Sequence, residues 1–384
     1  MSRSFAAAAL LNVTKISRTI DMPIKHMDEY RDPKIARRLL AEIEKTSKRD
    51  IRLMEVCGTH TMSIFRSGIR SALPESISLL SGPGCPVCVT AQNEIDAFIL
   101  LSRVDDVVVA TFGDLMRVPG SESSLQKERA KGRDVRVVYS TFDALDMAKQ
   151  NPEKKIVFLG VGFETTAPTI AAAIISARDK GLHNFFVFSA HKLIPPALSA
   201  LLATEGSSID GLILPGHVSV IIGTGAYLRL VEDYHVPCAV AGFEPVDILQ
   251  AVHVLVEQLE KKSAHLENCY PRAVTFDGNK KAQQVMETVF KKVDALWRGL
   301  GTIPRSGLCI RDEFSAYDAQ KAFDVSLPQA EDPQGCICGD ILTGKKTPPQ
   351  CPLYRTVCTP VDPVGPCMVS SEGTCAAFYR YHTA

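Results

Sequence analysis

The sequence of 384 residues has no excess of charge of either sign and no long apolar run. Its 43 basic residues balance its 43 acidic ones, and no basic run stands out, which argues against nucleic acid or an anionic membrane as a partner. No apolar stretch reaches the roughly 18 residues of a membrane-spanning helix. The start, Met1–Leu11, has a short apolar run with no small-x-small cleavage site after it, so it lacks the pattern of a signal peptide. We therefore expect a cytoplasmic chain of two or three domains.

The sequence also lacks the paired short cysteine knuckles of a structural zinc site, although it contains twelve cysteines. In a chain this long, clustered cysteines indicate metal or redox chemistry more often than a disulfide scaffold. Six lie in the last 49 residues, and four of these have the spacing C-x14-C-x6-C-x16-C, namely Cys336, Cys351, Cys358 and Cys375. Thiolates spread so widely through a Gly- and Pro-rich segment suit a [4Fe-4S] cluster, whose ligands can arrive from separate loops. The other two, Cys338 and Cys367, are placed to form a redox pair beside it.

Short apolar runs alternate with helical patterns between residues 50 and 250. The runs predicted to be strands are Ile51–Val56, Ile77–Ser81, Val107–Thr111, Val135–Ser140, Ile156–Gly160, Phe185–Ser189, Leu212–Pro215 and Val236–Ala241. Continuous β-branched runs of this length are typical of strands covered on both faces, so the pattern predicts an α/β fold with parallel sheets. A break near Gln150–Lys155 predicts two sheets of about four strands, in domains at 50–150 and 151–250. A Gly-Phe-Glu triplet that recurs at 162–164 and 242–244 favours two related halves.

The flanking regions, 1–49 and 251–384, are expected to form a third domain that holds the cluster. Helices are predicted at Pro33–Lys48, Val246–Lys262 and about Asn279–Trp297, and regular patterns fade after Gly299. We expect the first of these helices to pack on the third domain, and the residues before it to be an extension.

Four glycine-rich turns follow predicted strands. They are Cys57-Gly-Thr-His60, Gly82-Pro-Gly-Cys-Pro-Val-Cys88, Gly160-Val-Gly-Phe-Glu-Thr-Thr-Ala-Pro168 and Leu214-Pro-Gly-His-Val-Ser219. Ligands of open α/β sheets bind in the crevice at the carboxyl ends of the strands, so we expect these turns to converge on one site. The alternative is that the glycines only permit tight strand-to-helix turns.

Two of these turns contain cysteines that could carry chemistry. Cys57 and His60, a thiol and an imidazole three residues apart, could share one metal or one proton. The alternative is a buried cysteine with a capping histidine. Cys85 and Cys88 form a C-x-x-C between a predicted strand and a predicted helix, as in a thioredoxin. A dithiol/disulfide pair fits them better than metal binding, because no second C-x-x-C completes a zinc site.

The other two turns offer weaker candidates. Gly160–Pro168 has G-x-G without the third glycine of a dinucleotide-binding turn, and Glu164 falls where a phosphate would sit. Glu164 could instead anchor a partner or orient a ligand. His217 is a candidate by position, although a lone histidine is more often a satisfied hydrogen-bonding residue.

Taken together, the motifs resemble those of the hydrogenase maturation factor HypD family. The resemblance rests on the cluster spacing and on five motifs in collinear order: Cys57-Gly-Thr-His60, Gly82-Pro-Gly-Cys-Pro-Val-Cys88, Gly162-Phe-Glu-Thr-Thr-Ala-Pro168, Pro215-Gly-His-Val-Ser219 and Cys367-Met-Val-Ser-Ser-Glu-Gly-Thr-Cys375. It implies two similar, Rossmann-like α/β domains that face a central cleft, plus a cysteine-rich iron–sulfur domain. It also implies a scaffold on which the Fe(CN)2CO group of [NiFe] hydrogenases is assembled. The partners so implied are the small chaperone HypC and the cyanide donor HypE, which carries cyanide as a thiocyanate on its C-terminal cysteine.

Carried onto this sequence, the resemblance makes Cys57 the ligand of the iron group, with His60 close by. Cys85 and Cys88 would be a thiol pair in the cleft. A [4Fe-4S] cluster would be held by Cys336, Cys351, Cys358 and Cys375, with Cys338 and Cys367 as a second thiol pair. We predict an electron route from the cluster through the two thiol pairs to the iron, by exchange through mixed disulfides. Glu372 is a further candidate to hydrogen-bond a ligand or gate the cluster.

The chain is thus expected to be a redox-active assembly factor rather than a conventional turnover enzyme. Two other classes remain open at this point. A thiol–disulfide reductase acting on a protein disulfide would need Cys85 and Cys88 but not Cys57 or His60. A plain iron–sulfur electron carrier would have no use for the large α/β body.

Overall fold

All eight apolar runs predicted to be strands are strands in the computed structural model, which describes residues 28–204, 206 and 208–382. They are β1 (Ile51–Glu55), β2 (Ile77–Ser81), β3 (Val107–Thr111), β4 (Val135–Val137), β5 (Lys155–Gly160), β6 (Phe185–Ser189), β7 (Gly211–Pro215) and β8 (Cys238–Ala241). Every residue of β3, β7 and β8 is buried, as expected for strands covered on both faces. A short ninth strand, β9 (Leu266–Asn268), was not predicted. The α/β prediction is confirmed.

The strands pair differently from the predicted contiguous halves. One parallel sheet has the order β2-β1-β7-β8-β9, and the other has the order β4-β3-β5-β6. Leu53 of β1 therefore pairs with Gly211 of β7, although the whole second sheet lies between them in sequence. The prediction of a sheet boundary near Gln150–Lys155 is wrong, because β3 and β5 on either side of it are hydrogen-bonded neighbours. Alternating strands and helices reveal the elements of a parallel sheet but not which strands become neighbours.

Both sheets share one strand order. In each, the second strand in sequence lies outside the first, and the third strand lies on the first strand's other side. The order of winding therefore reverses between β1 and β7 in one sheet and between β3 and β5 in the other. Such switch points leave a crevice at the carboxyl ends of the two strands. The two Gly-Phe-Glu triplets do not mark equivalent places, because one follows the third strand of its sheet and the other follows the fourth.

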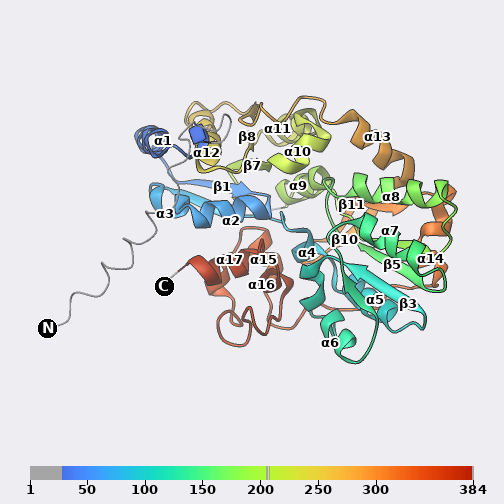
Figure 1. Ribbon diagram of the computed structural model, residues 1–384. Coiled ribbons are helices and arrows are strands. Elements are labelled where there is room, and N and C mark those ends of the chain that lie inside the picture. The colour runs from blue at the N-terminus through green and yellow to red at the C-terminus, as the bar shows by residue number, and fades with distance from the viewer. Residues whose placement is uncertain (1–27, 205, 207, 383–384) are drawn as a thin grey trace, which may run out of the picture.

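Helices cover both sheets (Figure 1). They are α1 (Pro33–Thr46), α2 (Gly58–Arg66), α3 (Ile69–Ala72), α4 (Pro86–Val89), α5 (Gln92–Ser102), α6 (Leu125–Ala130), α7 (Thr141–Gln150), α8 (Ala167–Asp179), α9 (Ile194–Leu202), α10 (Gly216–Ile222), α11 (Leu228–Tyr234), α12 (Pro245–Glu260) and α13 (Lys280–Val289), with 3-10 turns η1 (Asp28–Arg31), η2 (Gly113–Arg117) and η3 (Thr224–Tyr227). None of the helices in the described part of the chain is long and apolar enough to cross a membrane.

The first long helix, α1, begins at Pro33 after the N-cap Asp32, as the sequence predicts. It packs on α12 and shares a core cluster with β1 and β7, to which it contributes the fully buried Ile43. Most of α12 lies within 251–384, the range predicted to form the third domain, so α1 packs on the start of that range and on the first sheet. The predicted extension falls on residues 1–27, outside the described residues.

The predicted helix Asn279–Trp297 is wrong in its second half. Asn279 caps α13, but the chain from Phe290 to Trp297 is β10, which forms an antiparallel hairpin with β11 (Gly301–Ile310). Phe290, Val293 and Leu296 have helical spacing, which explains the prediction, and cross-strand pairing overrides that local preference. Regular structure thus continues beyond Gly299.

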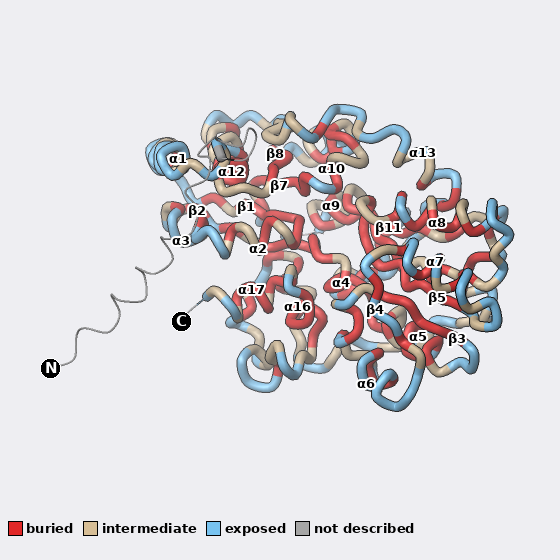
Figure 2. Tube along the Cα trace, viewed as in Figure 1, coloured by how far each residue is buried: buried red, intermediate tan, exposed pale blue. Residues whose placement is uncertain are grey.

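The C-terminal segment is built from short elements. They are η4 (Asp312–Tyr317), α14 (Ala319–Ala322), α15 (Cys338–Leu342), η5 (Pro348–Gln350), α16 (Pro366–Val369) and α17 (Thr374–Tyr381). Helix α17 packs on α2 and α16 packs on α4, while Arg117 donates hydrogen bonds to the carbonyls of Pro360 and Val369. Figure 2 shows that burial is concentrated along the strands and where this segment meets them. The cysteine-rich segment therefore contacts loops of both sheets.

Candidate functional site

The loop after β1 holds Cys57 in a fixed position. Cys57 has extended backbone angles at the N-cap of α2, and its amide donates a hydrogen bond of 3.0 Å to Glu55 Oε2. The hydroxyl of Thr61, one turn into α2, donates to the other oxygen of the same carboxyl at 2.5 Å. Glu55 is 1% exposed, and burial raises its pKa to about 7 although these hydrogen bonds oppose the shift. The buried carboxyl thus ties the strand end to the helix start.

The loops after β1 and β2 are joined backbone to backbone. Gly58 N–H donates to Gly84 O at 3.0 Å, and Gly82 N–H donates to Glu55 O at 2.7 Å. A Cβ on Gly84 would lie 2.1 Å from the amide nitrogen of Cys57. Gly84 is therefore required by the close approach of the two loops.

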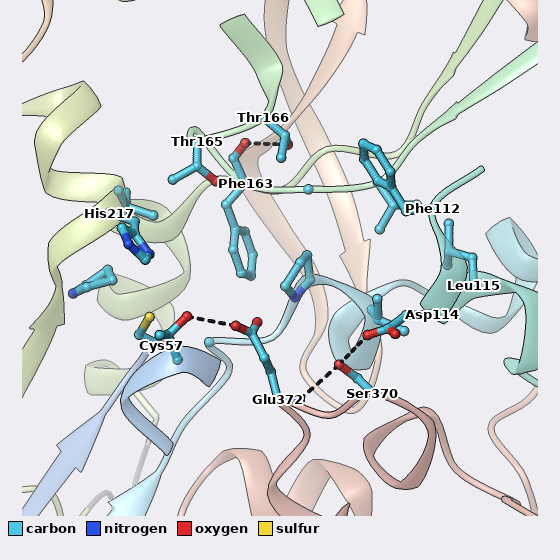
Figure 3. Close-up of a pocket in the computed structure, with 18 of the residues that line it drawn as sticks. Cys57, Phe112, Asp114, Leu115, Phe163, Thr165, Thr166, His217, Ser370 and Glu372 are labelled. Carbon is cyan, nitrogen blue, oxygen red and sulfur yellow. Dashed lines mark hydrogen bonds between the residues drawn. The ribbon is translucent and has the colours of Figure 1, made fainter. Parts of the chain in front are cut away.

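A cavity of about 430 Å³ opens where the switch points of the two sheets face each other (Figure 3). Such a volume is typical of small-molecule sites. Its lining comes from the loops that follow five strands and from the C-terminal segment: Val56, Cys57, Thr59, Gly84, Pro86, Val87, Phe112, Gly113, Asp114, Leu115, Val161, Gly162, Phe163, Thr165, Thr166, Pro215, His217, Val218, Ser370 and Glu372. The four predicted turns therefore converge.

The loop after β3, which was not among the four predicted turns, also contributes Phe112 to Leu115 to the cavity. The signal was present, because Phe112-Gly-Asp114 follows a predicted strand in the same way as the four turns that were recognised. Across the cavity, Ser370 donates a hydrogen bond of 2.9 Å to Asp114, and Thr59 donates one of 2.7 Å to Glu372. The C-terminal segment is thus tied to the loops of both sheets.

The imidazole in this cavity is that of His217 and not that of His60. His60 is fully buried, and its Nε2 lies 2.8 Å from Gly242 O. Burial lowers its pKa to about 4, so the ring is neutral. The Phe243 ring lies 4.8 Å from that of His60 and stacks at 3.9 Å on that of His217. His60 therefore packs behind the cavity wall. Its side chain does not contact that of Cys57, so the structure does not bring together the two groups that were expected to share a metal or a proton.

The Cys57 thiol is held protonated. Burial raises its pKa to about 12, the backbone amides of His60 and Thr59 oppose the shift, and the charges of Glu55 and Glu372 reinforce it. A bound cation would reverse this balance, so metal binding at Cys57 would release a proton.

Cys85 and Cys88 lie behind the wall of the cavity. Cys85 occupies the N-cap of α4, and its sulfur accepts the Cys88 amide at 3.4 Å. Gly84, Pro86 and Val87 line the cavity, whereas the two thiols are 4% and 1% exposed and face the C-terminal segment. Their expected place in the cleft is corrected to a position one layer beneath its surface.

The two thiols differ in charge. Burial raises the pKa of Cys85. Burial would also raise that of Cys88, but hydrogen bonds from Cys367 and Cys85 and the charge of Arg298 lower it to about 6. Arg298, from the turn of the β10–β11 hairpin, is 2% exposed and donates to Thr90 O at 2.9 Å and to Gln92 Oε1 at 2.8 Å. Because it lies some 210 residues along the chain from Cys88, it could not be recognised from the sequence.

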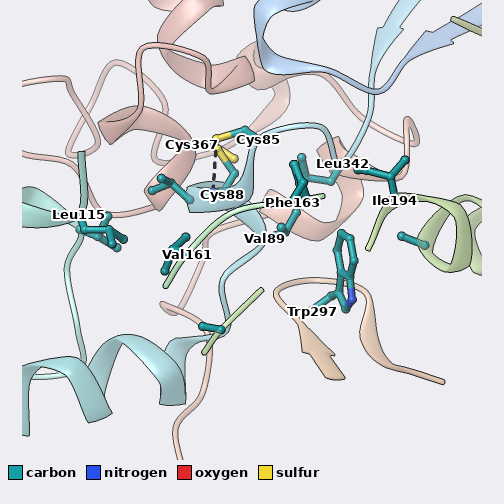
Figure 4. Close-up of a cluster of buried hydrophobic side chains, with 14 of the residues drawn as sticks. Cys85, Cys88, Val89, Leu115, Val161, Phe163, Ile194, Trp297, Leu342 and Cys367 are labelled. Atoms are coloured by element: carbon teal, nitrogen blue, oxygen red, sulfur yellow. Dashed lines mark hydrogen bonds between the residues drawn. The ribbon is translucent and has the colours of Figure 1, made fainter. Parts of the chain in front are cut away.

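Cys367 links the two thiol pairs. Its sulfur lies 3.1 Å from that of Cys338, and it also hydrogen-bonds Cys88 and Cys375. Figure 4 shows the sulfurs of Cys85, Cys88 and Cys367 meeting beside the buried apolar cluster. The described thiols therefore form an unbroken series from Cys375 through Cys367 to Cys88.

The four cysteines predicted to hold a cluster line one small apolar cavity of about 20 Å³, together with Cys338 and Cys367. A Cβ on Gly365 would lie 3.0 Å from the Cys336 sulfur, so a larger residue there would press on that thiol. The Cys358 sulfur accepts the Val364 amide at 3.3 Å, a contact that suits a charged thiolate. The donor set fits an iron–sulfur cluster, although its binding requires these loops to open. Among residues 28–382 with the gaps given above, no three His, Cys, Asp or Glu side chains are arranged around a single metal ion.

Glu164 does not reach the main cavity. One of its oxygens accepts the Ile194 amide at 3.0 Å at the start of α9, and the other is buried and has no hydrogen-bond partner among the described residues. Burial raises its pKa to about 7. It lines a separate cavity of about 450 Å³ between α9, α11 and α13. Its clearest task is to cap α9, where two prolines lack amides.

The sequence model described as "Hydrogenase formation hypA family", of the name HypD, matches residues 34–382. The chain belongs to the HypD family. It is 43% identical over 366 residues to the hydrogenase maturation factor HypD of Escherichia coli, covering 93% of this chain and 98% of the relative. The corresponding protein of Azotobacter vinelandii is 45% identical over 367 residues, covering 93% and 97%. That of Cupriavidus necator is 43% identical over 368 residues, with the same coverage. The family match spans every cavity loop and all six C-terminal cysteines.

Proposed function

We propose that this chain is a cytoplasmic scaffold on which the Fe(CN)2CO group of [NiFe] hydrogenase is assembled, with Cys57 as the iron ligand. The observation that carries the proposal is the position of Cys57, a single thiol in a cavity of about 430 Å³ at the switch points of two sheets. A soft thiolate suits low-spin iron, and the cavity leaves room for the small ligands on the metal. A second iron ligand would come from the small chaperone HypC, as the family resemblance implies.

The cyanide donor would be the thiocyanate on the C-terminal cysteine of HypE. Reduction of that thiocyanate by two electrons and one proton yields cyanide and a free thiol on the donor. The Cys85/Cys88 dithiol has the two electrons required and becomes a disulfide. Because both thiols lie beneath the cavity wall at Gly84, Pro86 and Val87, the loop that bears them must move for a direct reaction.

The pair Cys338/Cys367 would restore that dithiol by exchange. Cys367 loses its proton as it attacks Cys88, which forms a Cys367–Cys88 bond and releases Cys85 as a thiolate that takes up a proton. The Cys338 thiolate then attacks Cys367, which leaves a Cys338–Cys367 disulfide and releases Cys88 as a thiolate. Two electrons have moved toward the cavity, and the contacts of Cys367 with both Cys338 and Cys88 support this order.

Cys336, Cys351, Cys358 and Cys375 would hold a [4Fe-4S] cluster next to this pair. When bound, such a cluster supplies electrons one at a time. Cys375 is the ligand that contacts Cys367, so its side chain marks the point at which the thiol series begins.

The test of the scaffold is an infrared spectrum of the protein purified anaerobically with its small chaperone partner. Bands of iron-bound cyanide and carbon monoxide are expected, and they should be absent from Cys57→Ala prepared in the same way. Cys309→Ala is the control and should keep the bands, because Cys309 lines neither the cavity that contains Cys57 nor the small cavity lined by the C-terminal cysteines. Bands that survive in Cys57→Ala would remove Cys57 as the anchor.

The thiol order is tested by trapping. Mild oxidation of Cys338→Ser should link Cys367 to Cys88, detected as a cross-linked peptide pair by mass spectrometry. The same treatment of the wild-type protein should link Cys338 to Cys367. A disulfide between Cys57 and any of these thiols would contradict the order. The alternative, a reductase for protein disulfides, would need the buried Cys85 and Cys88 to reach a protein surface, and it gives Cys57 and its cavity no role.

A further inference from the structure

The polar side chains that line the main cavity differ in whether their hydrogen-bond donors are already used. Thr59 donates to Glu372, Ser370 donates to Asp114, and the Thr166 hydroxyl donates to the carbonyl of Phe163 at 3.2 Å. Each of these donors is therefore occupied by the protein itself, and none is free for a ligand.

Two side-chain donors remain uncommitted besides the Cys57 thiol. Neither the Thr165 hydroxyl nor the ring nitrogens of His217 hydrogen-bond to any described residue. His217 is held in place by the stacking of its ring on Phe243, which leaves its ring edge available. Its pKa is lowered by partial burial, so at neutral pH the ring has one N–H donor. Figure 3 shows Thr165, in the turn after β5, and His217, at the start of α10, around the cavity that also contains Cys57.

The remaining side chains of the lining are apolar or only accept hydrogen bonds. Val56, Val87 and Phe163 offer no hydrogen bond, and the carboxyl groups of Asp114 and Glu372 are acceptors when ionised. Among the described side chains of the cavity other than Cys57, those with a free donor for an electron-rich terminal atom are therefore Thr165 and His217. A ligand that accepts hydrogen bonds poorly would be placed against the apolar wall.

We propose that Thr165 and His217 are the residues that bind the two cyanide ligands of the iron group, each donating one hydrogen bond to a cyanide nitrogen. This inference rests on the proposed function of the cavity. A metal-bound cyanide has a lone pair and negative charge on its outer nitrogen, so it is a strong acceptor, whereas bound carbon monoxide is a weak one. Two free donors match two cyanides, and the apolar wall receives the carbon monoxide. The cavity would thereby distinguish the two kinds of diatomic ligand during assembly.

The experiment is infrared spectroscopy of the anaerobically purified complex with the small chaperone, comparing variants that remove one donor each. Thr165→Val keeps the shape of the side chain without the hydroxyl, and His217→Phe keeps a ring to stack on Phe243 without the N–H. Each change is expected to shift a cyanide stretching band by more than its half-width. Thr165→Ser, which retains the hydroxyl, and Thr169→Val, an exposed threonine on α8 outside the cavity, should both leave the bands at their wild-type positions.

Loss of the iron group in Thr165→Val, with full retention in Thr165→Ser, would equally support the proposal, because the same hydroxyl would then be required. Cyanide bands at unchanged positions in both Thr165→Val and His217→Phe would overturn it while leaving the scaffold intact. Absence of all such bands from the wild-type complex would overturn the scaffold and this inference together. Thermal unfolding of each variant identifies a protein that has failed to fold, and for such a position Thr165→Ala or His217→Leu, which also lack the donor, takes its place.

Discussion

The loops that follow β1 and β2 have similar backbone arrangements, but the pKa values of Cys57 and Cys88 are shifted in opposite directions. Both leave neighbouring parallel strands, both place a cysteine at the N-cap of a helix, and they share backbone hydrogen bonds through Gly58 and Gly84. Yet the pKa of Cys57 is raised to about 12, whereas that of Cys88, one turn into the second loop, is lowered to about 6. Cys57 lines an open cavity, and Cys88 is sealed behind it.

The difference comes from what each thiol meets in space. Burial raises the pKa of both thiols and Glu372 disfavours a charge on either, but at Cys57 the carboxyl group of Glu55 adds to these effects. Cys88 faces two other thiols and the guanidinium of Arg298, which favour one. A protonated thiol in an open cavity suits the capture of a metal with release of a proton. A buried thiolate beside other thiols suits disulfide exchange.

The largest expected effect is in the pH dependence of the two thiols. At pH 7 a thiol with a pKa of about 12 is ionised about once in 10⁵ molecules, and one with a pKa of about 6 about nine times in ten. Alkylation of Cys57 by a small reagent, followed by peptide mass mapping, should therefore accelerate about tenfold per pH unit from 7 to 9. Cys88 should instead titrate with a midpoint near pH 6, measured as the thiolate absorbance that is present in the wild-type protein and absent from Cys88→Ser. An alkylation rate of Cys57 that stops rising below pH 9 would contradict the raised pKa of this thiol.

The next largest expected effect is the loss of stability when a side chain at position 84 pushes the two loops apart. Gly84→Ala puts a Cβ 2.1 Å from the backbone of Cys57, which must shift because no flexible side chain can yield. We expect a loss of roughly 3 kcal/mol in the free energy of unfolding, measured by denaturant titration. Gly113→Ala, whose Cβ would meet only Val137 at 3.8 Å, is the matched control and should change stability by less than about 0.5 kcal/mol. Equal effects of both changes would mean that the loops are not tightly coupled.

The smallest effect isolates the charge beside Cys88. Arg298→Met should raise the pKa of Cys88 by roughly one unit, about 1.4 kcal/mol, because the favourable cation is lost. Cys57 should titrate as before, since Arg298 does not contribute to its shift. Arg298→Lys retains the charge and should keep most of the effect. An unchanged Cys88 midpoint in Arg298→Met would leave the neighbouring thiols as the sole cause of its low pKa.

Local sequence determined the elements. Continuous β-branched runs produced all eight predicted strands, and Asp32 with Pro33 marked the start of α1, because these signals act over a few residues. Glycine-rich turns after strands identified four of the five loops around the cavity for the same reason. Sequence could not show that β1 pairs with β7 rather than with β3, since any parallel strand can accept any other. Nor could it show that Phe290–Trp297 is a strand, because its helical spacing is overridden by the hairpin partner.

Within the site, the division is the same. The sequence by itself identified Cys57, the C-x-x-C pair and the six C-terminal cysteines as the residues that carry chemistry, because those side chains and spacings are chemically distinctive at short range. Only the tertiary structure decided that His217 and not His60 shares the cavity with Cys57, that Glu164 faces a different cavity, and that Cys367 joins the two thiol pairs. It also decided which thiol is charged. Protonation depends on burial and on charges brought together from distant parts of the chain, and these interactions exist only once the chain has folded.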